Sequence, residues 1–348
     1  MAKYRVCVVG CSPGRGRDHV RAFVKNADRF EIAGICDLDA ERMRVMGEEF
    51  KISARYNDVN KMLKEQKPDV FCFVTPPHIR LSLIELAISH GVKAIAYEKP
   101  IADNWPAAKA INKAVTDAGV LTVLSHQHKY GTYWRKARKL IEDGEIGDLL
   151  SVSASSSGWL LHYISHLLDY TMYLVGSDDV SWVVGHIHGR GLLGDNHPSP
   201  EQYFARFRFA NGLDASAVCG TLAPSLPPGN NSFWMNAGVT VQGTHGHVQV
   251  VSGSGLWAHT KSGKTVRDES SFSPDHDQPM YIKELADCLD DPTRIHSCNG
   301  DSAFRAFSVA MGGIISALDK RRVDLPLECD DDVLQRMRNE LPECEGLK

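Results

Sequence analysis

The first third of the sequence alternates short runs of β-branched and apolar residues with amphipathic helical patterns. Five of these runs are expected to be strands, at 5–10, 30–37, 69–75, 93–98 and 121–125. Helical patterns lie between them, most clearly at 80–90 and 105–118. Strands that alternate with helices at this spacing form a parallel sheet covered on both faces. The pattern therefore predicts an α/β fold with a doubly wound parallel sheet.

Beyond residue 126 the pattern changes to pairs of strand-like runs. One pair, 203–210 and 213–218, flanks Asn211-Gly212, which favours the two positive-φ positions of a type I′ hairpin. The other expected elements are a helix at 134–143, strands at 240–243 and 248–251, and helices at 280–289 and 303–318. We therefore predict two domains, residues 1–125 and residues 126–348, the second being α/β with a large open, mainly antiparallel sheet.

The composition excludes several classes of function. The chain has 348 residues, 43% hydrophobic and 24% charged, which is enough to bury the cores of two domains. Its formal net charge of −4 provides no basic field for nucleic acid or an anionic membrane. No apolar run approaches the roughly 20 residues that cross a bilayer. A start directly on a strand-like run, and nine cysteines without framework-like spacing, predict a reduced cytoplasmic protein.

A glycine-rich turn follows the first expected strand and precedes a helical pattern at 19–25. It is a displaced form of the G-x-G-x-x-G pattern, in which glycines let backbone N–H groups approach a pyrophosphate at a helix N-terminus. The alternative is a turn with a purely structural role. The residues that we assign to a dinucleotide here are Gly10, Ser12, Pro13, Gly14, Arg15 and Gly16.

Asp37 ends the second expected strand, about 20 residues after the last glycine of the turn, Gly16. A carboxylate at this position accepts hydrogen bonds from the adenosine ribose hydroxyls and repels a 2′-phosphate. We therefore expect NAD rather than NADP as the cofactor. Arg15 and Arg17 are the argument for NADP, although in this turn they can equally flank the pyrophosphate.

Three further strand ends carry polar residues at the edge where open α/β sheets bind their ligands. The run 93–98 leads into Glu98-Lys99-Pro100, a common tripeptide that can simply cap a strand. After a glycine-rich turn, however, it predicts a lysine close to the reacting atoms. For Thr75 and His78 the alternative is a turn and a helix cap without a ligand. The residues that we assign to the cofactor at these ends are Thr75, Pro76, His78, Glu98, Lys99 and Gln127.

The segment 158–169 carries two histidines within a helical pattern of apolar residues. His162 and His166 are expected on one helical face, with Asp169 on the same side. A histidine near its reference pKa of ~6.5 can take a hydroxyl proton while the carbon loses hydride. Two core histidines are one alternative. A metal pair is another, but no glutamate follows the first histidine and an obvious third ligand is missing, so we predict no metal.

Together these motifs resemble the Gfo/Idh/MocA family of NAD(P)-dependent sugar and inositol oxidoreductases. The resemblance extends over nearly the whole chain and rests on the glycine turn and on 36–37, 75–77, 98–100, 144–148 and 166–169. It implies a Rossmann domain followed by an α/β domain whose open sheet makes homodimer or homotetramer contacts. It also implies that Lys99 and His166 are the catalytic residues.

The chain departs from the family pattern where the substrate is expected. His162 stands where many inositol and glucose dehydrogenases carry an aspartate, and Arg80 where the family often has a histidine. The segment 125–130 is rich in histidine. The residues that we assign to the substrate are His162, Asp169, Trp159, Tyr163 and His128, the two aromatic ones as walls of a sugar site.

The resulting prediction is an NAD-dependent dehydrogenase that oxidises a secondary hydroxyl of a sugar, glycoside or inositol. Hydride passes to nicotinamide, and histidine and lysine assist the loss of the hydroxyl proton. One alternative is a redox-neutral glycosidase that works by oxidation, elimination, hydration and reduction. The other is an NAD-binding sensor without turnover.

Overall fold

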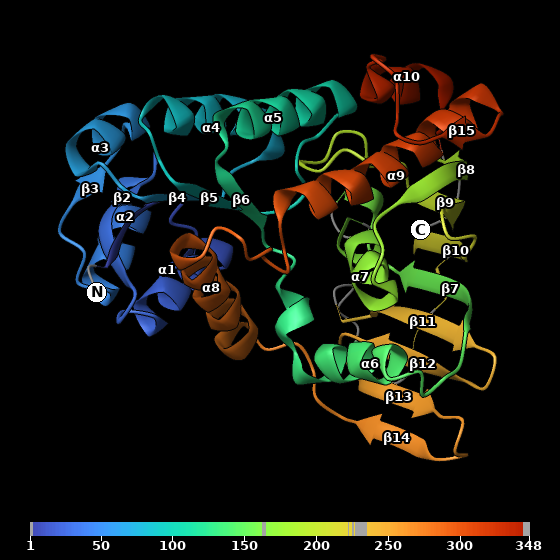
Figure 1. The fold of residues 1–348 in the computed structure, drawn as a ribbon. Helices are drawn as coiled ribbons and strands as arrows, with labels where there is room; N and C mark the ends of the chain where they lie inside the picture. The colour runs from blue at the N-terminus through green and yellow to red at the C-terminus, as the bar shows by residue number, and fades with distance from the viewer. Residues whose placement is uncertain (1–2, 162–164, 222, 225, 227–234, 344–348) are drawn as a thin grey trace. The chain divides into compact units, whose positions relative to one another are not determined.

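The computed structural model describes residues 3–161, 165–221, 223–224, 226 and 235–343, which form two compact units (Figure 1). Each unit is discontinuous in sequence. Unit 1 comprises residues 1–101, 109–130 and 273–301, and unit 2 comprises residues 102–108, 131–272 and 302–348. The domain boundary at residue 125 stays a prediction. The packing units show in addition that a late segment, 273–301, packs with the first part of the chain.

Unit 1 contains a six-stranded sheet of order β3-β2-β1-β4-β5-β6. All neighbouring strands pair in parallel, which confirms the predicted doubly wound sheet. The strands are β1 (Tyr4–Val9), β2 (Phe30–Cys36), β3 (Arg55–Tyr56), β4 (Val70–Phe73), β5 (Ala94–Tyr97) and β6 (Leu121–Leu124). The helices are α1 (Arg15–Lys25), α2 (Ala40–Glu49), α3 (Val59–Gln66), α4 (Arg80–Ser89) and α8 (Pro274–Asp290), with α5 (Trp105–Ala118) beginning in unit 2.

Two helices that follow the early strands begin at capping aspartates. The Asp39 carboxylate accepts the amides of Glu41 and Arg42, both at 3.0 Å, at the start of α2. The Asp58 carboxylate accepts the amide of Lys61 at 2.8 Å at the start of α3. Such caps satisfy amides that have no partner within the helix, and each contributes about 1 kcal/mol. The Asp39 cap fixes where α2 begins after the end of β2, and the Asp58 cap fixes where α3 begins.

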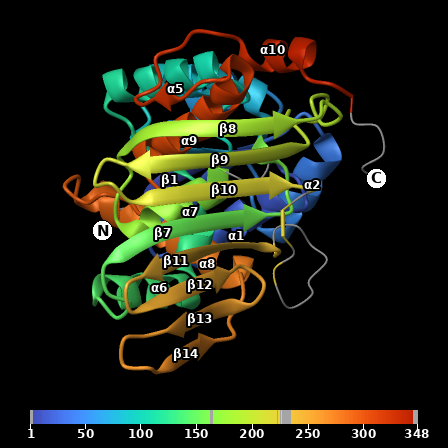
Figure 2. The same ribbon diagram turned by 90° about the vertical axis from the view of Figure 1, so that its right-hand side faces the viewer.

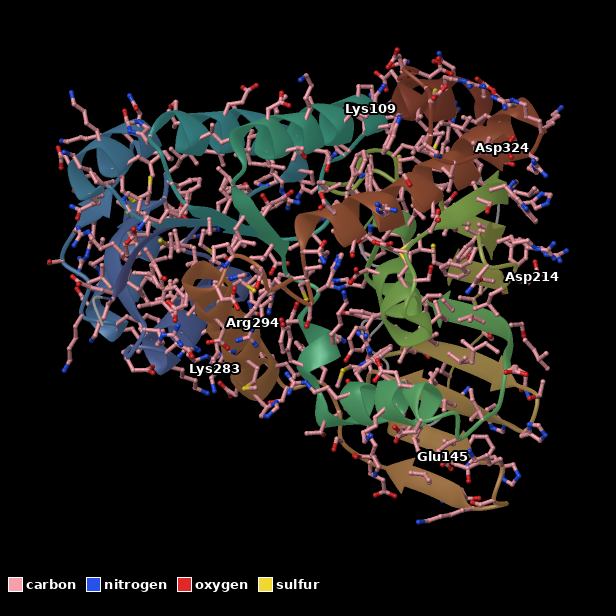
Figure 3. The ribbon with its side chains drawn as sticks, viewed as in Figure 1. Lys109, Glu145, Asp214, Lys283, Arg294 and Asp324 are labelled. Carbon is pink, nitrogen blue, oxygen red and sulfur yellow. The ribbon has the colours of Figure 1, made fainter. Side chains whose placement is uncertain are left out.

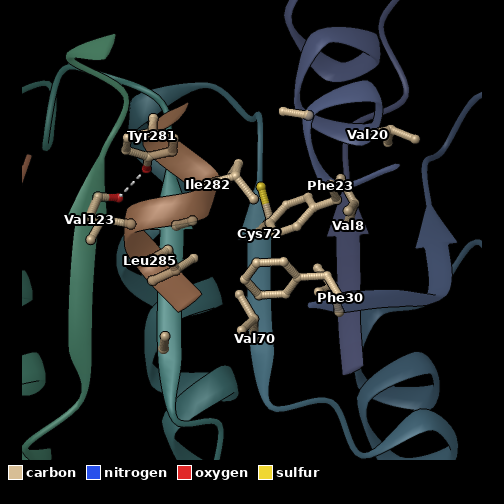
Figure 4. Packing of buried hydrophobic residues seen from close by; sticks show 14 of the residues in the cluster. Val8, Val20, Phe23, Phe30, Val70, Cys72, Val123, Tyr281, Ile282 and Leu285 are labelled. Atoms are coloured by element: carbon tan, nitrogen blue, oxygen red, sulfur yellow. Dashed lines mark hydrogen bonds between the residues drawn. The ribbon is translucent and has the colours of Figure 1, made fainter. Parts of the chain in front are cut away.

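A buried hydrophobic cluster joins the sheet of unit 1 to α1 and α8 (Figure 4). Phe23 of α1 and Phe30 of β2 meet edge to face, with ring centroids 5.2 Å apart. Tyr281 and Leu285 of α8 are fully buried, and the Tyr281 hydroxyl donates to the carbonyl of Val123 on β6 at 3.1 Å. Burial of a large apolar side chain contributes about 1.5–3 kcal/mol. This apolar face explains why α8 packs with unit 1.

Unit 2 contains a nine-stranded sheet of order β14-β13-β12-β11-β7-β10-β9-β8-β15 (Figure 2). The β7–β10 pair is parallel, and the other neighbouring pairs in this sheet are antiparallel. The prediction of a mainly antiparallel sheet is therefore confirmed. The strands are β7 (Leu149–Ser156), β8 (Val180–His188), β9 (Gln202–Phe209), β10 (Asp214–Gly220), β11 (Ala237–Gly243), β12 (Gly246–Val251), β13 (Gly255–His259), β14 (Thr265–Asp268) and β15 (Val323–Asp324). The helices are α6 (Thr132–Glu142), α7 (Ser165–Val175), α9 (Gly300–Asp319) and α10 (Val333–Glu340).

The helices α6, α7 and α9 lie on one face of this sheet, behind the strands in the view of Figure 2. The predicted helices at 134–143 and 303–318 correspond to α6 and α9. Among the described residues, no helix combines the length and apolar character that a membrane span requires.

The turn between β9 and β10 differs from the predicted type I′. Gly212 has a φ of +88°, but Asn211 does not have a positive φ. The amide of Gly212 donates to the carbonyl of Phe209 at 2.9 Å, which makes a type I turn followed by a left-handed glycine. The Asn211 side chain accepts the amide of Leu213 at 3.1 Å. Asparagine therefore serves here through its side chain and not through its backbone.

An ion pair fixes the register of this hairpin. Asp214, labelled in Figure 3, is directly opposite Arg208 in the β9–β10 ladder. The Arg208 guanidinium donates to the two Asp214 oxygens at 3.1 and 2.7 Å. Cross-strand pairs of opposite charge favour one register over its neighbours.

Candidate functional site

Two glycines of the turn after β1 are fixed by close backbone contacts. Gly10 has a φ of +94°, and a Cβ on it would lie 2.3 Å from the carbonyl oxygen of Val74. A Cβ on Gly16 would lie 2.2 Å from the carbonyl oxygen of Gly10. Gly14, the N-cap of α1, has open space around it instead. The turn thus leaves its backbone accessible at the start of α1, which fits the pyrophosphate of a dinucleotide.

Ser12 takes the position of a glycine in the usual pattern. Its hydroxyl accepts the amide of Gly16 at 3.0 Å, and its carbonyl accepts the amide of Arg17 at 3.0 Å. Pro13 is exposed beside it. These bonds close the extended turn, so its extra residue does not prevent α1 from starting directly behind the end of β1.

Asp37 lies directly after β2, at the carboxyl end of the sheet. Its carboxylate accepts the amide of Cys11 at 2.6 Å and the amide of Asp39 at 2.9 Å. A carboxylate offers about four acceptor positions, so both oxygens keep capacity for ribose hydroxyls. The bond to Cys11 also connects the end of β2 to the glycine turn. This geometry supports the predicted ribose contact.

A cavity of about 520 Å³ is lined by the glycine turn, α1 and α2. Cys11 and Pro13 come from the turn, Arg17 from α1, and Met46 and Glu49 from α2. Its size and its mixed apolar and charged lining suit one nucleoside half of a dinucleotide.

The end of β4 leads into a short 3-10 turn (Pro77–Ile79). The Thr75 hydroxyl is buried and has no hydrogen-bond partner among the described residues, whereas Pro76 and His78 are exposed. A buried hydroxyl without a protein partner fits a ligand at this edge. The Arg80 guanidinium donates to the carbonyls of Thr75 at 2.9 Å and of Lys99 at 3.3 Å. Arg80 therefore ties the ends of β4 and β5 together, a role that its sequence position did not predict.

Glu98 follows β5 and is buried as an anion. Its Oε1 accepts from Nε and Nη2 of Arg15 at 3.0 and 2.8 Å and lies 2.9 Å from Nε2 of His19. Burial raises the pKa of Glu98, but Arg15 and His19 outweigh it and hold that pKa well below its usual range. Arg15 also donates to Gln278 of α8 at 2.9 Å. The Arg15 side chain is thus engaged with Glu98. His19 and Gln278 complete a network that the sequence did not predict.

Lys99 is partly buried beside this network. Burial lowers the pKa of Lys99 to about 8, Glu98 opposes that shift, and Arg15 and Arg80 add to it. An amine with such a pKa can release and take up a proton near neutral pH, which is the property of a proton-transfer group.

The segment after β6 is buried. Burial lowers the pKa of His128 to about 3, and Arg15, His126 and Lys99 add to that shift. His128 is therefore neutral, with one donor and one acceptor nitrogen. The Gln127 side chain lies 2.9 Å from the Ser125 hydroxyl.

In unit 2, His166 and Asp169 lie on α7 and are both buried. Nδ1 of His166 is 2.9 Å from the hydroxyl of Tyr170, which orients the imidazole ring. Tyr170 was not predicted, although its spacing of four residues on a helix is the signal that indicates such a contact. Trp159 is partly buried. The predicted His162 and Tyr163 lie outside the described residues, so the expected stacking of His162 on His166 stays a prediction.

Within the part of the chain that the structure describes, no group of three or more histidine, cysteine or carboxylate side chains could hold a metal ion.

The first part of the chain matches a known family. Residues 4–126 match the family model GFO_IDH_MocA, an oxidoreductase family with an NAD-binding Rossmann fold. The chain is 31% identical over 145 residues to a D-apiose dehydrogenase of Paraburkholderia graminis, a match that covers 42% of this chain and 38% of that enzyme. It is 24% identical over 235 residues to a 2,7-anhydro-N-acetylneuraminate hydratase of Mediterraneibacter gnavus, covering 61% and 59%. The matches thus span less than two thirds of either enzyme.

The fold of the whole chain is similar to that of solved structures. A levoglucosan dehydrogenase in complex with NADH and levoglucosan superposes with a TM-score of 0.80, covering 94% of this chain and all of that one at 17% identity. This likeness shows that both units share the architecture of such enzymes.

Proposed function

We propose that this chain, which belongs to the Gfo/Idh/MocA family of oxidoreductases, oxidises a secondary hydroxyl of a sugar, glycoside or inositol with NAD. The observation that carries the proposal is Lys99, a partly buried amine with a pKa of about 8 at the carboxyl end of β5 in an NAD-binding Rossmann sheet. Relatives and structural neighbours that act on or bind carbohydrates support the substrate class.

The proposed roles of the two catalytic residues are distinct. NAD, when bound, accepts the hydride of the reacting carbon. His166, its ring held by Tyr170, takes the hydroxyl proton. Protonated Lys99 donates a hydrogen bond to the same oxygen as negative charge develops there.

Other residues are proposed to orient the substrate. His128, which is neutral, offers a donor and an acceptor to sugar hydroxyls, and Asp169 offers acceptors. Trp159 and Tyr163 are proposed as aromatic walls, and His162 as a further hydrogen-bonding group in place of the family aspartate.

A redox-neutral reaction is the second candidate. The similarity to a 2,7-anhydro-N-acetylneuraminate hydratase favours it. In such a reaction a transient oxidation is followed by elimination, hydration and reduction, and the cofactor returns to its starting state.

The experiment that tests these candidates is incubation of the purified protein with NAD and a panel of sugars, glycosides and inositols. Absorbance at the NADH band and product analysis are recorded together, with Lys99→Ala as the inactive control. Formation of NADH with substrate supports the dehydrogenase. Product without net NADH supports the redox-neutral reaction, and silence across the panel favours a sensor or a substrate outside the panel.

Asp37→Ser is expected to shrink the preference for NAD over NADP by about tenfold or more. The substitution removes the carboxylate that faces the ribose hydroxyls and repels a 2′-phosphate. Titration of NAD and NADP into wild type and variant measures the ratio of the two dissociation constants. A wild type that already prefers NADP would show that the assignment of Asp37 is wrong.

His162→Ala is expected to raise KM and lower kcat/KM while NAD affinity stays nearly unchanged, because an imidazole there accepts from or donates to a sugar hydroxyl without a buried unpaired charge. Steady-state kinetics with each substrate of the panel check this. Loss of wild-type activity with a chelator, restored by a divalent ion, would refute the role and favour a metal pair.

We further propose a homodimer or homotetramer assembled through the sheet of unit 2. Large apolar side chains on its strands are exposed, with Phe204 44% and Trp257 42% accessible. Phe204→Glu is expected to convert the oligomer to monomer, as measured by sedimentation velocity, whereas a monomeric wild type would contradict the assembly. A cytoplasmic location stays a prediction.

A further inference from the structure

The cavity beside the glycine turn contains two guanidinium groups that an uncharged ribose does not need. Arg17 and Arg42 both line it. Arginine near the end of the second strand is the side chain that accommodates the 2′-phosphate of NADP in dinucleotide-binding folds. Arginines in such a cavity can flank the pyrophosphate of either cofactor, and they would also favour a 2′-phosphate unless a carboxylate holds them.

Each of these arginines is paired with a carboxylate. Nε of Arg17 lies 2.9 and 2.8 Å from the two Glu49 oxygens, and Nη2 lies 2.5 Å from Oε1. Nε of Arg42 lies 3.3 Å from the Asp39 carboxylate, a single longer contact. The Arg17–Glu49 pair is a two-pronged contact of the kind that a guanidinium also makes with a phosphate. Glu49 therefore engages Nε and Nη2 of Arg17, one of the two-donor edges with which a guanidinium can bind a phosphate.

The partner of Glu49 lies outside the helix that carries it. Glu49 is the last residue of α2, and the last turn of that helix contains no basic residue. A carboxylate at a helix C-terminus is unfavourable, because the free carbonyls there already carry partial negative charge. The contact with Arg17 of α1 opposes that cost, and the charge of Arg21 on the same helix as Arg17 acts in the same direction.

The charges of the cavity show what this pairing does. Arg17 pairs with Glu49 and Arg42 with Asp39, the N-cap of α2, whereas Glu41 of the lining pairs with Arg44. A 2′-phosphate adds about −1.5 to −2 charges. The cavity thus contains the donors for a phosphate and also the carboxylates that neutralise them.

We propose that Glu49 is a residue that determines cofactor specificity: by holding the Arg17 guanidinium, it withholds a phosphate-binding group and so favours NAD over NADP. This inference rests on the assignment of Asp37 to the adenosine ribose that is proposed above. Asp37 repels a 2′-phosphate directly, whereas Glu49 acts by removing the cation that would bind it. The two residues therefore act separately on the same discrimination.

The test is the ratio of the NADP and NAD dissociation constants, measured by isothermal titration calorimetry on the full chain at one salt concentration. Glu49→Gln keeps the shape of the side chain and removes its charge. The ratio of the NADP to the NAD constant is expected to fall by about tenfold, because a released guanidinium gains charge-assisted hydrogen bonds to the phosphate. Loss of one exposed ion pair costs little stability, so the variant is expected to fold.

Glu48→Gln is the matched control. It removes the same charge from the neighbouring helix position, where the carboxylate pairs with Arg44 at 2.6 Å and does not line the cavity. Its ratio is expected to change less than about twofold, since exposed charges at a distance are screened. The double variant Arg17→Gln, Glu49→Gln is expected to return the ratio to near its wild-type value.

The possible outcomes separate this inference from the assignment on which it rests. A lower ratio in Asp37→Ser with no change in Glu49→Gln would leave the ribose assignment intact and overturn the role of Glu49. An equal fall in Glu48→Gln would also overturn it, because the effect would then be general charge. No change in Asp37→Ser would instead overturn the assignment of the ribose site.

Discussion

Lys99→Ala and His166→Ala are each expected to lower kcat by about 10²–10⁴-fold, the range of a positioned proton-transfer or hydrogen-bonding group. Lys99 is a partly buried amine whose burial lowers its pKa to about 8, and His166 is a buried imidazole oriented by Tyr170. We propose that both act on one hydroxyl. The double variant should then be little slower than the slower single variant, because groups that act together are not additive.

Steady-state kinetics at saturating NAD measure these effects, with NAD titrations of the same samples as the control for cofactor binding. NAD is expected to bind the His166→Ala variant. Near-full activity of that variant would contradict the role of His166, and His162 would be the next candidate for the base. Rate losses that multiply in the double variant would show that the two residues act on different steps.

Glu98→Gln is expected to lower the free energy of unfolding by about 3 kcal/mol at neutral pH. The substitution leaves the buried His19 without its carboxylate and removes one of the two carboxylates that hold the Arg15 guanidinium, the other being Asp18. The Arg15 side chain is 32% exposed, which places the effect at the lower end of the range for broken buried pairs. Urea denaturation measures it, with Glu48→Gln as an exposed control expected within about 0.5 kcal/mol of wild type. Equal midpoints for Glu98→Gln and wild type would contradict the account.

The same prediction has a pH dependence with a definite sign. The pKa of Glu98 is depressed in the folded protein, so its stabilising contribution is present above the unfolded carboxyl pKa of ~4.3 and is lost as the pH falls through the folded value. The difference in stability between wild type and Glu98→Gln is therefore expected to shrink below about pH 4.

Glu98 also raises the pKa of Lys99. The Glu98→Gln substitution removes that negative charge, so it is expected to lower the pKa of Lys99 and to move the alkaline limb of kcat from about pH 8 to lower pH.

The sequence predicted the sheet of unit 1 well because its strands are buried on both faces. Residues of β4 and β5 are buried throughout, so they appear as uninterrupted apolar runs bounded by turns. The strand β3 was missed because it consists of two residues, Arg55 and Tyr56, that carry no periodicity. Strand identity is thus predictable where burial imposes a pattern, and not where one short ladder contact makes the strand.

The contacts of α8 and of Arg15 depend on packing between distant parts of the chain. The helix at 280–289 was predicted, but only the tertiary contact of Tyr281 with Val123 shows that it belongs to unit 1. Arg15 was predicted to lie at the pyrophosphate, and its ion pair with Glu98 joins residues that no local pattern relates. The turn at Asn211-Gly212 was wrong in type because side-chain and backbone bonds compete at asparagine.

The most direct test of the central claim is isotopic. A carbohydrate that the protein converts is prepared with deuterium on the carbon of the candidate hydroxyl, and the cofactor is analysed by mass spectrometry during turnover. The account predicts that NADH carries the deuterium from the substrate, and that Lys99→Ala and His166→Ala suppress this labelling. Conversion of the substrate with a cofactor that never acquires deuterium would contradict hydride transfer and with it the proposed function.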